Sequence, residues 1–328
     1  MEKCVIIYQI DEEYIEEITS FFNFYALKEK ANIEFYKVKW DEKIKPEISK
    51  FNKAIILSLL GKREIKTHKE ISHFLTKHKI FQINPFSCSF KADDKYFTIS
   101  KLKKNGISVP ESLIIKKGEK DNIETKIEEF LDKKKLSFFY IQPNFGTEGR
   151  ETYFFSKEEF KKDKNYIIDI IKNILQSQSV IIKEKRGNVY FYKEEEKGYR
   201  NITFRIFIWQ FNSKIENNYG FAEVSKDEKS FITSPEKGGK IISFSEGLKN
   251  IYYNENGSFK RLVLTEEEIK FIKSETIKLY KCFNKGAKEQ LLLCGIDFLL
   301  EYNGKKVFPL FLEINPRPAG INRCTEIV

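Results

Sequence analysis

The segment 292–320 constrains this chain more than any other stretch, because it combines a turn signal with one isolated carboxylate. Two apolar runs flank Asn303-Gly304, and Asp297 interrupts the first run. An Asn-Gly pair supplies the two positive φ angles of a tight turn, so the pattern predicts an antiparallel hairpin. In that hairpin Asp297 is expected roughly opposite residue 310 and diagonally near 312–313.

Two further polar residues, Glu313 and Asn315, end the second run. They are two residues apart, so they share a face, and we expect them to converge with Asp297 at one end of the hairpin. Two carboxylates and an amide oxygen suit Mg²⁺, or Mn²⁺ in its place, that keeps several waters and bridges to phosphates. The alternative is a hairpin whose polar residues only face water.

Composition narrows the class of protein. The chain has 328 residues, of which 41% are hydrophobic and 15% aromatic, enough for two or three packed units. The net charge is +10, but the lysines stand beside glutamates along the chain and do not cluster with Gly and aromatic residues. This argues against nucleic-acid binding, and a soluble anionic substrate accounts for the excess charge. The five cysteines are scattered, which argues against a disulfide framework or a zinc site.

Other classes of function are excluded by what the chain lacks. No apolar run approaches the roughly 20 residues of a membrane span, and residues 1–7 lack the layout of a signal peptide. We therefore expect a cytoplasmic protein without a membrane partner. His68, His73 and His78 fall on one predicted helix at a spacing of five, which places them on different faces. We interpret them as surface or edge residues, not as a metal site.

The first 85 residues alternate between apolar strands and amphipathic helices. Strands are expected at 4–10, 32–38, 53–60 and 80–84, with helices at 12–30 and 64–79. This alternation predicts a doubly wound parallel sheet that binds ligands at the carboxyl ends of its strands. From residue 202 the pattern becomes antiparallel, with a hairpin turn expected near 212–213.

Several motifs stand in an order that resembles the ATP-grasp superfamily. Its nucleotide domain ends with a Gly-x-Asp strand and a Glu-x-Asn-Pro-Arg strand, as Gly295-Ile296-Asp297 and 313–317 do here. Asn84-Pro85, Asp94-Lys95 and the Gly-Ile-x-Val-Pro run at 106–110 precede them in the family's order. The resemblance covers about 84–320. It implies an α+β fold with three subdomains, 1–100, 101–185 and 186–328, and a nucleotide between the last two.

The resemblance also assigns roles to particular residues. Lys95 would face the nucleotide phosphates, and the loop after the strand 137–142 would cover them through Asn144, Gly146, Thr147 and Gly149. One departure stands out, because the family usually has a lysine where this chain has Gln142. The hinge positions between the second and third subdomains are filled by Lys183, Glu184 and Lys185. Arg205 and Arg317 would offset charge that develops in phosphoryl transfer; Arg205 interrupts an apolar strand, where a guanidinium is costly unless paired.

The implied activity is that of a carboxylate–amine ligase. ATP would phosphorylate a small carboxylate, and an amine or a peptide would displace phosphate to give an amide, with release of ADP. Two alternatives remain at this stage, a kinase on the same fold and a weakened nucleotide-binding protein, the latter because Gln142 is neutral. The sequence leaves open whether the acceptor is a free amino acid or a peptide, and whether the chain forms a homodimer.

Overall fold

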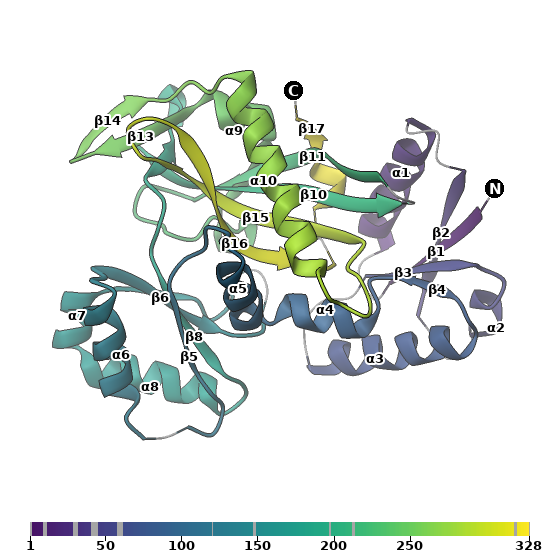
Figure 1. Ribbon diagram of the computed structural model, residues 1–328, viewed down its shortest axis with the longest axis horizontal. Helices are drawn as coiled ribbons and strands as arrows, with labels where there is room; N and C mark the ends of the chain where they lie inside the picture. Colours follow the sequence, from purple (N-terminus) through teal and green to yellow (C-terminus); the bar gives the residue numbers. More distant parts are fainter. Residues whose placement is uncertain are drawn as a thin grey trace.

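Three β-sheets follow one another along the chain (Figure 1). The computed structural model describes residues 2–8, 12–28, 32–40, 45–57, 62–119, 121–146, 149–196, 198–211, 214–317 and 320–327. Thr147 and the turn expected near 212–213 lie outside the described residues. The mixed α and β architecture agrees with the expected α+β class.

The first sheet is parallel, with strand order β2-β1-β3-β4. Its elements are β1 (Glu2–Tyr8), α1 (Glu12–Lys28), β2 (Ile33–Lys39), α2 (Lys45–Ile48), β3 (Lys53–Leu57), α3 (Lys62–Lys77) and β4 (Phe81–Ile83). Strand β1 is apolar on both faces because helices cover both. Cys4 and Ile6 share a core with α1, whereas Val5 and Ile7 share one with α3. The predicted doubly wound sheet is therefore present.

The second sheet is antiparallel, with order β5-β8-β6-β7, and is reached through α4 (Phe86–Asp93) and α5 (Lys95–Lys104). Its elements are β5 (Ser112–Ile115), α6 (Ile123–Lys133), β6 (Phe138–Pro143), β7 (Tyr153–Ser156), α7 (Lys157–Lys162), α8 (Lys164–Leu175) and β8 (Val180–Glu184). Alternate residues such as Phe139, Ile141 and Ile182 pack against α6 and α8. Residues between them in the strands, including Gln142 and Lys183, therefore belong to the other face.

The third sheet is the largest and is organised around β10. Its elements are β9 (Val189–Phe191), a 3₁₀ turn η2 (Glu194–Glu196), β10 (Arg200–Phe211), β11 (Lys214–Val224), η3 (Pro235–Lys237), β12 (Lys240–Ser243), α9 (Phe244–Lys249), β13 (Ile251–Glu255), β14 (Ser258–Arg261), α10 (Glu266–Asn284), β15 (Leu293–Tyr302), β16 (Val307–Asn315), η4 (Ile321–Arg323) and β17 (Thr325–Glu326). Strand β10 pairs with β11, with β15 and, at its start, with β9. Figure 1 shows α10 lying across one face of this sheet.

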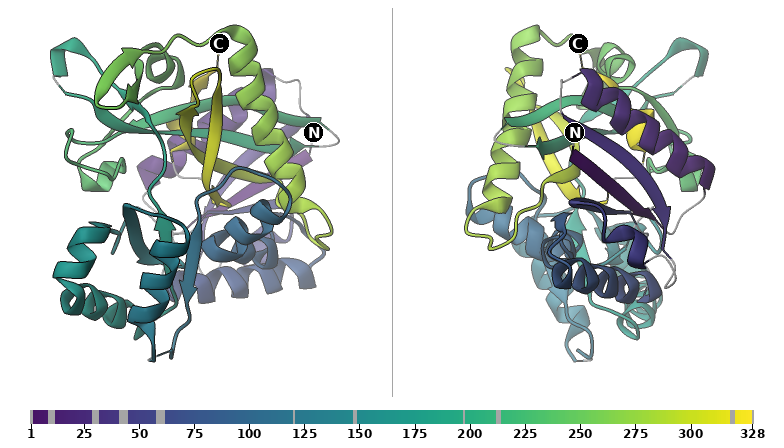
Figure 2. Two further views of the ribbon diagram at one scale, coloured as in Figure 1. Left: turned by 60° about the vertical axis from the view of Figure 1, so that its left-hand side comes forward. Right: turned by 90° about the vertical axis from the view of Figure 1, so that its right-hand side faces the viewer.

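The two faces of β10 are used differently. Phe204, Ile206 and Ile208 share a core with residues of α9 and α10. Phe207 and Trp209, on the opposite face, share a core with α1 and β1 of the first sheet, which Figure 2 shows beside the third sheet. Arg205 lies on this second face but belongs to neither core. The part of this face around Arg205 therefore lies outside both apolar cores.

Asn84 joins the first sheet to the third. It adopts a left-handed conformation with φ of 63° and is almost completely buried. Its side-chain amide donates to the carbonyls of Leu293 and Pro316. Its oxygen accepts from the backbone N–H groups of Leu292 and Leu293, at 2.8 and 3.0 Å. One side chain thus binds backbone groups at the start of β15 and just after β16.

The β15–β16 hairpin forms as predicted, but its turn and register differ from the expectation. A four-residue connection, 303–306, replaces the two-residue turn, and of the Asn-Gly pair only Gly304 has a positive φ. The Asn303 side chain instead accepts from the N–H groups of Lys305 and Lys306. A bulge between Asp297 and Phe298 shifts the register again, so Asp297 pairs directly with Glu313 and not with residue 310. The carboxylates are therefore closer than the sequence predicted.

Smaller differences concern helices. Residues 157–175 form two helices, α7 and α8, which are divided at Asp163, whose φ of −113° and ψ of 35° are not helical. Helix α5 runs across residue 100, so we place the proposed boundary of the first subdomain after Lys104 instead. Among the described helices, none is long and apolar enough to cross a membrane.

Candidate active site

A row of charged side chains crosses three adjacent strands of the third sheet. Asp297 of β15 pairs with Arg205 of β10 on one side and with Glu313 of β16 on the other. Directly paired residues of antiparallel strands project to the same face. The row therefore reads Glu313, Asp297, Arg205, and it continues to Phe221 of β11, whose ring lies 5.3 Å from the Arg205 guanidinium carbon.

Arg205 and Asp297 form a two-point ion pair. The Arg205 Nε and Nη2 atoms donate to Oδ1 and Oδ2 of Asp297 at 2.5 and 2.6 Å. Burial works against a charged guanidinium, but Asp297 more than offsets this and raises the pKa of Arg205. The arginine in the apolar strand is therefore paired, as its position requires.

Asp297, Glu313 and Asn315 are the candidate ligands of a cation. The Asn315 amide nitrogen donates to Asp297 Oδ2 at 3.0 Å and contacts Glu313 Oε1 at 3.5 Å. An amide oxygen would reach a shared cation only after a half-turn of this amide. No group of three or more His, Cys, Asp or Glu side chains that could hold a metal occurs in the described part of the chain. The donor set fits Mg²⁺ that retains several waters, and it does not fit a closed structural metal centre.

Lys95 lies opposite these carboxylates. It opens α5, is 9% exposed, and its Nζ lies 4.0 Å from Glu313 Oε2 and 2.6 Å from the Gly146 carbonyl. Asn144 fixes this arrangement, because its side chain accepts from Tyr96 N–H at 2.9 Å and donates to Asp94 at 3.0 Å. The start of the predicted phosphate loop is thus bound to the first turn of α5. Lys95, Asn144 and Gly146 are brought together.

Gln142 and Lys183 share the face of the second sheet that has no helices. Gln142 pairs with Ile181, two residues before Lys183, and both polar side chains are 8% exposed. The Gln142 Nε2 atom is buried without a hydrogen-bond partner among the described residues. The pKa of Lys183 is lowered to about 8, chiefly by burial and in part by Lys95, while Glu313 and Asp297 act in the opposite direction. Lys183 is therefore within electrostatic reach of both carboxylates.

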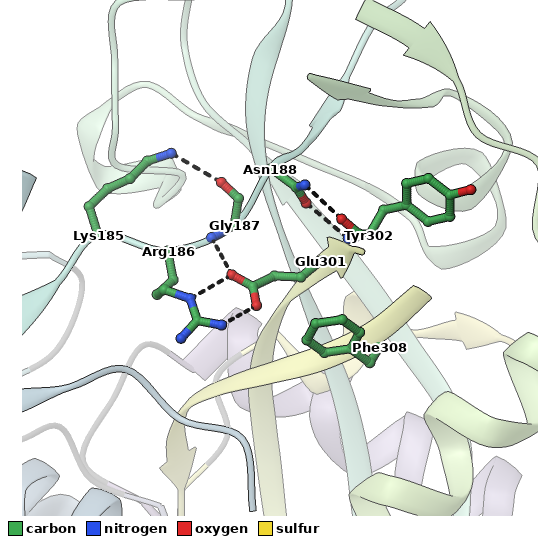
Figure 3. A pocket seen from close by; sticks show the side chains of 7 residues that line it. All are labelled: Lys185, Arg186, Gly187, Asn188, Glu301, Tyr302 and Phe308. Atoms are coloured by element: carbon green, nitrogen blue, oxygen red, sulfur yellow. Dashed lines mark hydrogen bonds and ion pairs between the residues drawn. The ribbon is translucent and has the colours of Figure 1, made fainter. Parts of the chain in front are cut away.

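The segment after β8 lines a cavity of about 310 Å³ (Figure 3). The lining residues are Lys185, Arg186, Gly187, Asn188, Glu301, Tyr302 and Phe308. Glu301 holds the segment by accepting from Arg186 Nε at 2.7 Å and from Gly187 N–H at 3.0 Å. Glu301 lies four residues after Asp297 on β15, about 13 Å away along the strand. The cavity and the charged row therefore occupy two ends of one strand face.

Two of the three predicted hinge side chains are already engaged inside the protein. Glu184 accepts from Glu111 N–H at 3.0 Å. Lys185 donates to the Gly187 carbonyl at 3.1 Å and to the Tyr190 hydroxyl at 3.3 Å. Lys185 lines the cavity, whereas Lys183 belongs to the charged group and Glu184 to neither. The three hinge residues are thus not one cluster.

Comparisons with known proteins complement this geometry. No protein-family model and no curated protein sequence matches the chain. The crystal structure of D-cycloserine synthetase DcsG matches with a TM-score of 0.59 and 12% identity, over 97% of this chain and 93% of that one. D-alanine–D-alanine ligase from Bacillus anthracis complexed with ATP matches with a TM-score of 0.56 and 16% identity, over 97% and 87%. ATP-grasp ligase PsnB complexed with minimal precursor matches with a TM-score of 0.55 and 13% identity, over 98% and 92%.

The chain has the ATP-grasp fold. The resemblance drawn from the motifs is thereby confirmed at the level of the fold, over almost the whole chain. At 12–16% identity the likeness shows how the chain is arranged and not which substrates it uses. Roles for individual residues must therefore rest on their contacts in this structure.

Arg317 lies outside the charged row. Its guanidinium is paired with Asp93 of α4, and Nη1 lies 3.4 Å from His68 Nδ1. The expectation that His68 is a surface or edge residue is wrong: it is 2% exposed, while His73 and His78 are exposed. Burial, followed by Arg317, lowers the pKa of His68 to about 3, so its ring is neutral. In this structure Arg317 thus joins the third sheet to α3 and α4.

Of the predicted phosphate loop, the structure describes both ends. Phe145 stacks on Phe90 of α4 with ring centroids 4.8 Å apart, which anchors the first end more firmly than its composition suggested. At the other end, Gly149 lies against Ile232, in the connection between β11 and β12. Gly146 and Gly149 therefore border the site, whereas Thr147 is outside the described residues.

One residue near the charged row was missed by the sequence reasoning. Glu223 of β11 is beside Arg205, and its pKa responds to Arg205, Asp297 and Glu313. The signal was present, because a glutamate interrupts the run Tyr219–Val224 as Arg205 interrupts its own strand. The run was interpreted only as the answering strand of a hairpin.

Proposed function

We propose that the protein is an ATP-dependent carboxylate–amine ligase that forms an amide or peptide bond and releases ADP and phosphate. The observation that carries this proposal is the meeting of two carboxylates, Asp297 and Glu313, with Lys95, Lys183 and Arg205. The cationic side chains suit a triphosphate, and the carboxylates suit its metal cation. This group of charged residues lies where the second and third sheets face each other.

The chain's own residues have distinct tasks in this proposal. Asp297, Glu313 and, after a turn of its amide, Asn315 would hold Mg²⁺ or Mn²⁺. The bound cation would supply charge neutralisation to the phosphate oxygens. Lys95 and Lys183 bind the phosphates directly, since Lys95 Nζ lies 4.0 Å from Glu313 Oε2 and Lys183 is close enough to lower the pKa of Glu313. Arg205 stabilises charge on the transferred phosphoryl group and the acyl oxygen.

The cavity at the hinge is the proposed site of the adenine. Its volume of about 310 Å³ is at the lower end of ordinary ligand pockets. A nucleotide lying along β15 from Glu301 to Asp297 would place its base in this cavity and its phosphates at the charged row. The cavity lies away from the chemistry because it holds the part of the nucleotide that does not react.

The reaction then proceeds by two displacements. A substrate carboxylate attacks the terminal phosphorus, and ADP leaves. An amine then attacks the acyl carbon of the acylphosphate, and phosphate leaves with the bonding electron pair. The carboxylate is a small molecule; the acceptor is an amine or a peptide. The two rival functions fail at different steps: a kinase on this fold stops after the first displacement, and a nucleotide-binding protein performs neither.

The proposal is tested by measuring ADP and phosphate release together while amino acids and peptides are supplied in pairs, with mass spectrometry of the products. A ligase releases both in a one-to-one ratio with a new amide. ADP without phosphate, together with a phosphorylated product, identifies a kinase. Nucleotide binding without any ADP release identifies the binding protein, which the neutral Gln142 favours. Glu255→Gln, an exposed change on β13 far from the row, is the control variant.

A further inference from the structure

A third carboxylate, Glu223, lies on the same face of the sheet as the charged row. Glu223 pairs with Thr203, two residues before Arg205, and Phe221 pairs with Arg205 itself. Thr203, Arg205, Phe221 and Glu223 therefore project to one face. Ala222 and Val224, between them, face the core with α9 and α10. Glu223 is thus directed toward the site and not into the apolar core.

A turn of the chain holds the surroundings of Glu223 in place. Thr233, 9% exposed, forms a hydrogen bond with the Thr203 hydroxyl at 3.0 Å. The chain then returns through Gly239, where an added Cβ would lie only 2.1 Å from the Thr233 carbonyl, so only glycine allows this approach. Among the described residues Glu223 forms no ion pair within 4.0 Å, in contrast to Asp297. The Thr233 hydroxyl forms a hydrogen bond with the Glu223 carboxylate, which helps to orient it.

The environment of Glu223 brings its protonation into the neutral range. Burial raises the pKa of Glu223 to about 7; Arg205 and the Thr233 hydroxyl oppose the rise, and Asp297 and Glu313 add to it. A carboxyl group with such a pKa exchanges protons readily at neutral pH. The other acids of the site are worse bases. Burial raises the pKa of Glu313, but Lys95, Lys183 and Arg205 together lower it by more. Both carboxylate oxygens of Asp297 accept hydrogen bonds from Arg205.

We propose that Glu223 is the general base that takes the proton from the attacking amine. The inference rests on the proposed ligase function. As the nitrogen lone pair forms the N–C bond, the bond from the acyl carbon to the phosphate oxygen breaks and phosphate leaves with that electron pair. One N–H proton passes to the Glu223 carboxylate. Glu223 is two strands from Asp297, about 12 Å between Cα atoms, which leaves room for the acyl group between them.

Hydroxylamine separates this role from a structural one. It attacks acylphosphates without needing a base, because its proton is lost to water, and the hydroxamate formed is measured by colour with iron. The native protein, Glu223→Gln and Glu223→Asp are compared, with each common amino acid as the carboxylate and either an amine or hydroxylamine as the nucleophile. Glu216→Gln, on the same strand but paired with Lys214 at its far end, is the matched control.

In Glu223→Gln we expect amide formation to fall about 10²–10⁴-fold, the usual contribution of general base catalysis. Hydroxamate formation should stay within about threefold of native, and the acid limb of the native rate profile near pH 7 should disappear. Glu223→Asp should recover part of the amide synthesis. Equal losses with both nucleophiles, or no loss, would overturn the inference while leaving the ligase function standing. If the native protein itself yields neither amide nor hydroxamate, the proposed function and this inference fail together.

Discussion

Two buried arginine–aspartate pairs of the same molecule serve different purposes. Arg205 and Asp297 lie on adjacent strands, with Glu313 next in the row and Lys95 and Lys183 close by. Arg317 and Asp93 lie at a junction of elements beside the neutral ring of His68, and Lys95 and Glu313 are near enough to act on the pKa of Asp93. The first pair is surrounded by groups that a charged ligand could recruit. In the second pair the close contacts of Arg317 are with Asp93 and His68.

A shared motif does not fix the direction in which every one of its residues points. Asp297, Glu313 and Asn315 lie within paired strands, where alternation determines the face. Arg317 follows Pro316, beyond the end of β16, so alternation no longer applies. The resemblance gives Arg205 and Arg317 one role, but in this structure Arg317 contacts Asp93 and His68 and not the charged row. Whether it also acts in catalysis is what the following experiments separate.

The largest effect is expected at the charged row. Glu313→Gln removes one of only two carboxylates of the cation site, so turnover should fall at least about a thousandfold, several kcal/mol of transition-state stabilisation. Asp297→Asn should be as inactive, but it also weakens the pair with buried Arg205 and so lowers stability. Steady-state ADP release, with thermal unfolding of each variant, measures both. Near-normal turnover in a folded Glu313→Gln protein would mean that the row is not the metal site.

The junction should respond in stability. Arg317→Ala leaves Asp93, whose side chain is 4% exposed, without its partner, so the free energy of unfolding should fall by about 3–5 kcal/mol in urea titrations. The double variant Asp93→Asn, Arg317→Gln should lose less, because no charge is left buried. A stable Arg317→Ala protein without ATP turnover would show that the Arg317–Asp93 pair is not mainly structural, and it would give Arg317 the catalytic role that the resemblance implies.

Lys183→Ala tests whether a cation on β8 makes up for neutral Gln142. A hydrogen bond to a charged group contributes about 1.5–3 kcal/mol, so nucleotide affinity or turnover should fall by one to two orders of magnitude. Lys172→Ala, an exposed lysine beside Asp169 on α8, is the control. Lys185→Ala should matter less than Lys183→Ala, since its ammonium is engaged by Gly187 and Tyr190. A silent Lys183→Ala, together with a large gain in ATP turnover in Gln142→Lys, would favour the weakened nucleotide-binding protein.

The same lysine predicts a pH dependence of binding. Its pKa is lowered to about 8 in the free protein, and phosphates should raise it by favouring the ammonium form. Above pH 8 binding must therefore take up a proton, so affinity should fall by up to about tenfold per pH unit. Calorimetry in buffers of different ionisation enthalpy measures the uptake. The slope should be absent in Lys183→Ala, and its persistence there would assign it to another group.

The smallest effect concerns the loop that follows β6. Saturating ATP and Mg²⁺ should slow hydrogen exchange in peptides covering 140–152, because the nucleotide occupies the space below the loop. The change should be modest at Asn144 and Phe145, which are already anchored without ligand. Exchange that is unchanged throughout this segment would count against a role of the loop in covering phosphates.

Much of the fold and of the charged row can be predicted from the sequence, and the features that cannot have physical causes. Alternation and the place of one carboxylate in an apolar run predicted the meeting of Asp297 and Glu313. The register differed because a side-chain turn at Asn303 and a bulge after Asp297 are local choices that hydrophobic patterning does not record. His68 was misplaced because five-residue spacing shows only that three histidines differ in direction. Glu223 was overlooked although its signal equalled that of Arg205.

Asn84 and the core around it have a mechanical consequence. The core that contains Ile6 and Phe22 of the first sheet also contains Phe207 and Trp209 of the third. The core of the second sheet, among the described residues, is drawn only from 113–182. Counted by sheets the molecule has three parts, but the first and third sheets share one core, whereas the second sheet, in its described residues, adds only Ile181 and the partly buried Ile114 to the core of the third. Opening and closing around a nucleotide should then be a rigid-body rotation of residues 112–184 relative to the unit formed by the first and third sheets.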